Sequence, residues 1–140
     1  MTPHAVRLRV RYDEIDGMGV IHHPNFLIYF EIARTEFMRD AGVLYADLER
    51  RGFLLVVTGA TARYHANVRY DDEIVVRTSI AQMGRATIRF AYTVEDAGGR
   101  LLCEGTTDHA CVGPDKAKPI RFPPEILALK SLAPRSAERY

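Results

Sequence analysis

A carboxylate and the start of an apolar, helix-like stretch lie close together near the N-terminus of this chain. Asp16 stands in the segment DEIDGMGVIHHPNF (residues 13–26), in a glycine-flanked turn directly before that stretch. A carboxylate can activate water or attack carbon, and the backbone N–H groups at a helix N-terminus polarise a carbonyl. The pair suits hydrolysis of an activated acyl group. The competing interpretation is that Asp16 only forms an Asx-type turn, a common use of Asp before Gly.

Length and composition indicate one globular domain with a small-molecule partner. The chain has 140 residues, of which 47% are hydrophobic and 26% charged, enough to bury a substantial core. A formal net charge of +1 gives no general field for a nucleic acid or an anionic membrane. No apolar run is long enough to span a bilayer and no signal-like segment is present, so we expect no membrane insertion and a cytoplasmic location.

The two cysteines are expected to be free, buried thiols. Cys103 and Cys111 are eight residues apart in what the pattern predicts to be one strand. That spacing separates them by about 26 Å, too far for a disulfide. Buried, unpaired thiols are typical of a reducing compartment.

A strand on the N-terminal side of Asp16 and a long helix on its C-terminal side are the first elements that the sequence predicts. Alternation of apolar residues with arginines predicts a strand over residues 6–12. Apolar residues at three- and four-residue steps predict a helix over residues 24–41, with Pro24 in its first turn and Gly42 as its C-terminal cap. Much of the remaining helix surface is also apolar, so other structure should wrap this central helix on several sides. Its Glu31 and Arg34 have the i,i+3 spacing of an ion pair.

The rest of the chain reads mainly as strands. We expect a short helix at residues 44–51 and a buried strand at 53–66 with a bulge at Gly59. Alternating strands follow at 74–80, 88–94 and 101–112, joined by turns at 83–85 and 96–99. A loop at 113–124 then leads to a short helix at 125–132 and a frayed tail at 133–140. The order predicts an α+β domain over residues 1–132, in which a five-stranded antiparallel sheet curls around the long central helix.

Residues 11–42, RYDEIDGMGVIHHPNFLIYFEIARTEFMRDAG, resemble the hotdog-fold acyl-CoA thioesterases. The similarity is to the branch with 4-hydroxybenzoyl-CoA thioesterase and the YbgC-like short-chain acyl-CoA thioesterases. A weaker match is RYDDEIVVRT, residues 69–78. The resemblance covers nearly the whole domain. It implies a hotdog fold, hydrolysis of a short-chain aliphatic or aromatic acyl-CoA without a cofactor, and a homodimer or homotetramer (a dimer of dimers) with sites at subunit interfaces.

The resemblance also assigns the catalytic residues. The family's catalytic aspartate falls on Asp16, and the residue whose backbone N–H faces the thioester carbonyl falls on His23, since Pro24 has no N–H. The YbgC-like members also carry histidine at this position. A thiol with a pKa of about 8.5 leaves with little help, so one carboxylate and a polarised carbonyl suffice. Asp16 acts either as a general base toward water or as a nucleophile that gives a mixed anhydride.

Other residues are implied to contact substrate. Lys118 and Arg85 match family positions that reach the phosphates of CoA, and Arg121 lies with Lys116 and Lys118 in the late loop. The alternative is that these are ordinary surface charges. Met18 departs from the small residue usual in the family and is expected to narrow or reshape the acyl pocket.

Three other interpretations remain open from the sequence. The histidine pair at 22–23 can simply cap or line the helix entry, and the five histidines lack metal-ligand spacing, so no metal is expected. The same chemistry can act on acyl groups carried by a carrier protein. A non-catalytic acyl-CoA-binding protein on the same fold would bind the thioester without releasing thiol.

Overall fold

The computed structural model of the chain describes residues 4–115 and 118–133. Its elements follow in the order β1 (His4–Arg9), η1 (Tyr12–Glu14), α1 (Asn25–Asp40), α2 (Tyr45–Arg50), β2 (Leu54–Tyr64), β3 (Glu73–Met83), β4 (Thr87–Asp96), β5 (Leu101–Val112), α3 (Pro124–Leu127) and η2 (Ala128–Leu132). Apart from Ala133, the predicted tail lies outside the described residues, so the domain boundary at 132 stays a prediction.

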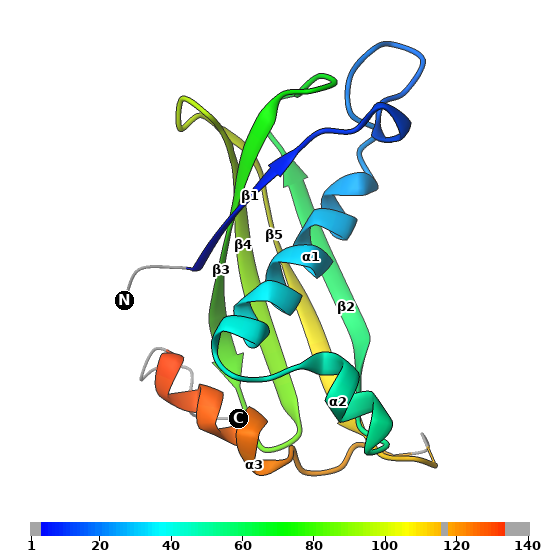
Figure 1. Ribbon diagram of the computed structural model, residues 1–140, viewed down its shortest axis with the longest axis vertical. Helices are drawn as coiled ribbons and strands as arrows, with labels where there is room; N and C mark the ends of the chain where they lie inside the picture. The colour runs from blue at the N-terminus through cyan, green and yellow to red at the C-terminus, as the bar shows by residue number, and fades with distance from the viewer. Residues whose placement is uncertain (1–3, 116–117, 134–140) are drawn as a thin grey trace.

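The strands form one antiparallel sheet in the order β1-β3-β4-β5-β2. Helix α1 lies across one face of this sheet, and no helix in the described part of the chain covers the other face (Figure 1). The predicted five-stranded sheet is therefore confirmed. The expectation of a long helix enclosed by the sheet holds only in part, because α1 has 16 residues and its Leu27 and Ile28 side chains are 39% and 47% exposed.

The core lies between α1 and the sheet. Alternate residues of β3 and β4 are buried, as their period-two pattern predicts. Phe30 of α1 stacks on Tyr92 of β4, with ring centroids 4.3 Å apart. Gly105 of β5 permits this approach, since an added Cβ would lie 2.8 Å from the Phe30 ring and 2.2 Å from the Thr61 carbonyl oxygen.

The predicted ends of α1 are confirmed to within one residue. The helix stops at Asp40, and Gly42 follows with a φ of 91°, a left-handed conformation that favours glycine. The Val43 N–H then donates to the Met38 carbonyl at 2.8 Å, as in a Schellman cap. The i,i+3 spacing of Glu31 and Arg34 allows an ion pair, but none forms between these two described side chains.

Two of the predicted strands differ from those observed. The first ends at Arg9 rather than at residue 12, because the Glu14 carboxylate accepts the Arg11 N–H at 2.7 Å and the chain turns there. Strand β2 is largely exposed rather than buried, because it lies at the edge of the sheet. The bulge at Gly59 is confirmed by a register shift between Val57 and Gly59.

The remaining predictions on the fold are mostly confirmed. Strands β3, β4 and β5 form the expected meander, and both cysteines are buried and unpaired in β5. The last predicted helix divides into α3 and η2. None of the helices in residues 4–115 and 118–133 has the length and apolar content that crossing a bilayer requires.

Candidate active site

Asp16 belongs to the loop of residues 15–21, and this loop lies beyond the N-terminal end of α1 (Figure 1). A bridge between Ile15 and Ile21 closes the loop, and the Asp16 N–H donates to the Val20 carbonyl at 2.8 Å. Its Oδ1 atom accepts the Met18 N–H at 2.8 Å and the Val20 N–H at 3.4 Å, so the Asx-type turn is present. Within the described residues, Oδ2 accepts no hydrogen bond. The backbone therefore orients the carboxylate and leaves one oxygen available for chemistry.

His23 lies in the turn that leads into α1. The His23 carbonyl accepts the Phe26 N–H at 3.1 Å, and α1 proper begins at Asn25. The His23 N–H has no acceptor among residues 4–115 and 118–133, as is usual for the first N–H groups of a helix. The imidazole is exposed and packs edge-on against Tyr64, at 5.4 Å between ring centroids. An unpaired N–H at a helix start can polarise a carbonyl.

Glu14 is the residue at this end of the molecule that sequence reasoning missed. Its side chain is 8% exposed, and its Oε1 accepts the Arg11 N–H at 2.7 Å and the Tyr29 hydroxyl at 2.8 Å. Burial, and after it the Glu14 carboxylate, raises the pKa of Tyr29, so that hydroxyl stays protonated and donates. The spacing of Arg11 and Glu14 could have revealed their contact, whereas nothing local links Glu14 to Tyr29.

The predicted phosphate contacts lie elsewhere in the chain. Arg85 is in the connection between β3 and β4, and its carbonyl accepts the Phe122 N–H at 2.8 Å. This hydrogen bond brings Arg85 beside the loop that carries Lys118 and Arg121. All three side chains are exposed, and none of them forms an ion pair within the described part of the chain. Lys116 lies outside the described residues. The three described cations are therefore free to meet an anion.

A single chain does not bring these cations to Asp16 and His23. His23 packs on Tyr64, at one end of β2. Near the other end, Val56 pairs with Ala110, and Ala110 pairs with Thr87, two residues after Arg85. The eight residue-to-residue steps from Val56 to Tyr64 span about 26 Å. The two groups thus lie toward opposite ends of the sheet.

Met18 lies at the tip of the Asp16 loop. Its side chain is 85% exposed in the single chain. Any acyl group that Met18 contacts must therefore approach the outer side of this loop.

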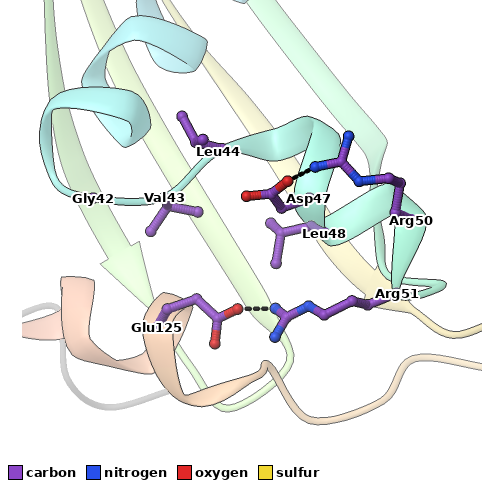
Figure 2. A pocket seen from close by; sticks show the side chains of 8 residues that line it. All are labelled: Gly42, Val43, Leu44, Asp47, Leu48, Arg50, Arg51 and Glu125. Carbon is purple, nitrogen blue, oxygen red and sulfur yellow. Dashed lines mark ion pairs between the residues drawn. The ribbon is translucent and has the colours of Figure 1, made fainter.

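Two hollows lie near α2. One has a volume of about 320 Å³, and its cations are already neutralised, because Arg50 pairs with Asp47 and Arg51 pairs with Glu125 (Figure 2). It contains none of the predicted site residues. The other, of about 260 Å³, opens beside the β2 edge and is lined by Glu31, Arg34, Thr35, Met38, Tyr45, Glu49, Leu55 and Val57.

A buried polar chain lies in the core, away from the Asp16 loop. The Thr107 hydroxyl is 2.6 Å from the Tyr92 hydroxyl and 2.8 Å from His109 Nε2. Burial, with a smaller effect of Arg34, lowers the pKa of His109 to about 4, so the imidazole is neutral. In the described ranges, no three His, Cys, Asp or Glu side chains are grouped closely enough to hold a metal ion.

Comparisons with known proteins agree on one family. Residues 10–129 match the model of the thioesterase-like superfamily. The chain is 34% identical over 115 residues to the putative acyl-CoA thioesterase YneP of Bacillus subtilis (strain 168), covering 82% of this chain and 83% of that protein. It is 32% identical over 121 residues to the acyl-CoA thioester hydrolase YbgC of Escherichia coli O157:H7, covering 86% and 90%.

A solved structure extends the match to three dimensions. The DHNA-CoA thioesterase from Staphylococcus aureus superposes with a TM-score of 0.85 at 30% identity, covering 94% of this chain and 95% of that one. Sequence, family model and structure therefore lead to the same conclusion: the chain belongs to the thioesterase-like superfamily of hotdog-fold proteins.

Proposed function

We propose that this protein hydrolyses short-chain aliphatic or aromatic acyl-CoA thioesters to the free acid and CoA. One observation carries the proposal: the backbone holds Oδ1 of Asp16, Oδ2 is free, and the nearby helix start offers the His23 N–H without an acceptor among the described residues. The named activities of the related proteins, acyl-CoA thioester hydrolysis among them, support this chemistry.

Asp16 and His23 have complementary roles in the proposed reaction. The thioester oxygen accepts the His23 N–H, which withdraws electrons from the carbonyl carbon. Asp16 either takes a proton from the attacking water or itself adds to that carbon, and water then cleaves the resulting anhydride. In both routes the C–S bond breaks and CoA leaves as the thiolate. The negative charge on the former carbonyl oxygen is greatest in the tetrahedral state, where loss of one donor costs about 10²- to 10³-fold in rate.

A homodimer joined through the β2 edges would complete this site. Among the described strands, β5 is the one that pairs with β2, and Val57 on this edge is 54% exposed. An unpaired edge with exposed apolar residues favours pairing with another strand. Antiparallel pairing of two β2 strands about Gly59 sets Tyr64 opposite Leu54 of the partner subunit. The Asp16 end of one chain would then lie beside Arg85, Lys118 and Arg121 of the partner subunit, and a dimer of dimers can build on this unit.

The pocket beside the β2 edge favours a small acyl group. At about 260 Å³ it is near the lower limit of typical ligand pockets, and in the paired arrangement it would lie near the Asp16 loop of the partner subunit. A short aliphatic chain or a single aromatic ring suits this volume better than a long chain.

Thiol release from a panel of thioesters tests the proposal. The panel contains acetyl-, short-, medium- and long-chain and benzoyl-type CoA, and the same acyl groups on acyl carrier protein. We expect release from short-chain or benzoyl-type CoA. Preference for the carrier-protein substrates would identify a carrier-protein thioesterase, and binding without release from any substrate would identify an acyl-CoA-binding protein. Lys118→Ala should raise KM for acyl-CoA, and an unchanged KM in a folded variant would remove Lys118 from the site.

A further inference from the structure

Glu14 is a carboxylate that the proposed reaction does not use and that the fold nevertheless buries. It is the one buried acidic residue among those that the structure describes, with 6% of its surface exposed. Burying an ionised carboxylate is unfavourable unless hydrogen bonds and an opposite charge compensate it. The structure supplies both, so the contacts of Glu14 indicate what it holds in position.

The Glu14 side chain connects Arg11, just after β1, to Tyr29 of α1. Oε1 accepts hydrogen bonds from the Arg11 N–H at 2.7 Å and from the Tyr29 hydroxyl at 2.8 Å. Oε2 accepts Arg11 Nε at 3.3 Å. Tyr29 is 1% exposed and lies on the second turn of α1, so the carboxylate is anchored to a rigid part of the helix.

The Glu14 backbone connects the start of the Asp16 loop to the end of that loop and to the first residue of α1. Its carbonyl accepts the His22 N–H at 2.8 Å and Asn25 Nδ2 at 3.0 Å. Asp16 follows Glu14 by two residues, and His23 follows His22 directly. A shift of Glu14 would therefore move the free carboxylate oxygen and the free N–H relative to each other.

We propose that Glu14 is a positioning residue, which through Tyr29 and Asn25 fixes the Asp16 carboxylate against the His23 N–H. This inference rests on the proposed thioesterase function and adds to it a residue that does not touch the substrate. Displacement of a reacting group by about 1 Å can cost about 10²-fold in rate, so a modest relaxation of the loop has a large effect.

The test compares Glu14→Gln and Tyr29→Phe with a matched control, Tyr92→Phe. Tyr92 is also a buried tyrosine whose hydroxyl makes one side-chain hydrogen bond, to Thr107, but it does not contact the loop. We expect Glu14→Gln and Tyr29→Phe to lower kcat by about 10- to 100-fold with KM within about threefold of wild type. Tyr92→Phe should lower the melting temperature to a similar extent as Tyr29→Phe and leave kcat within about twofold of wild type.

Two further measurements separate positioning from other roles. If Glu14 only positions other groups, Glu14→Gln should lower kcat by the same factor at every pH and leave the shape of the pH profile unchanged. Disappearance of one ionisation from the pH profile of Glu14→Gln would instead make Glu14 a direct acid or base. Because Glu14 is proposed to act through Asp16, Glu14→Gln should have little further effect in an Asp16→Asn background. Full additivity there, or a lower melting temperature with unchanged kcat in either single variant, would overturn the inference. Failure of the wild type to release thiol would instead overturn the proposed function.

Discussion

Two inactive variants of this protein should restore a working site when they share one dimer. One variant is Asp16→Ala, and the other replaces Arg85, Lys118 and Arg121 by alanine together. The first removes the proposed carboxylate and the second removes the proposed phosphate contacts. These groups are separated by about 26 Å along β2 in one chain. In the proposed β2-paired dimer, each site takes the carboxylate from one chain and the cations from the other.

The expected size of each effect follows from these contacts. Loss of a general base costs about 10²- to 10⁴-fold in rate. Three exposed charge contacts at about 1 kcal/mol each amount to about 3 kcal/mol, or about 10²-fold in kcat/KM. In a mixed dimer of the two variants, one site is intact and the other carries both defects. Purified mixed dimers should therefore show about half of the wild-type activity.

The assay uses mixed dimers co-expressed with two different tags, purified through both tags, and checked by native mass spectrometry. Thiol release is measured at a substrate concentration well below KM. A reciprocal control pairs a wild-type chain with a chain that carries all four substitutions. For shared sites this dimer has no intact site and should be nearly inactive. An inactive variant pair together with a half-active control dimer would refute the shared site.

Two predictions concern the fold itself. Gly105→Ala should destabilise the protein by about 1–3 kcal/mol in urea unfolding, since the new Cβ would overlap the Thr61 carbonyl oxygen and the Phe30 ring. Gly98→Ala, whose nearest contact is 3.5 Å away, should change stability little, and equal effects would contradict this packing. The folded protein lowers the pKa of His109 from 6.5 to about 4. As the pH falls, His109 therefore gains its proton in the unfolded chain at a higher pH than in the folded protein. Stability should be lost from about pH 6.5 to 4 by up to about 1.4 kcal/mol per pH unit, and His109→Gln should flatten this slope.

The sequence predicted the elements that local patterns determine. The ends of α1 follow from Pro24 and Gly42, and the alternation in β3 and β4 gave their buried faces, although both strands extend beyond the predicted ranges by up to three residues. The bulge at Gly59 likewise follows from a glycine within an otherwise apolar run. Each of these features depends on residues within a few positions of one another.

Features that depend on distant residues were missed. The exposure of β2 follows from its place at the edge of the sheet. An apolar run in the sequence does not distinguish an edge strand from a central one. The contact between Glu14 and Tyr29 joins residues 15 positions apart, which no periodicity reports. The distance between Asp16 and Arg85 follows from the strand order, which local patterns do not determine; the family resemblance, which implies sites at subunit interfaces, was the one sequence signal that agrees with it.

The measurement that tests the central claim most directly is kcat/KM for the preferred acyl-CoA in wild type and in folded Asp16→Asn. The substitution keeps the side-chain size and an oxygen that can accept the Met18 N–H, and it removes the negative charge. Hydrolysis that depends on the Asp16 carboxylate predicts a loss of about 10²- to 10⁴-fold with an unchanged melting temperature. Retention of more than about a tenth of the wild-type activity would show that the chemistry does not depend on this carboxylate.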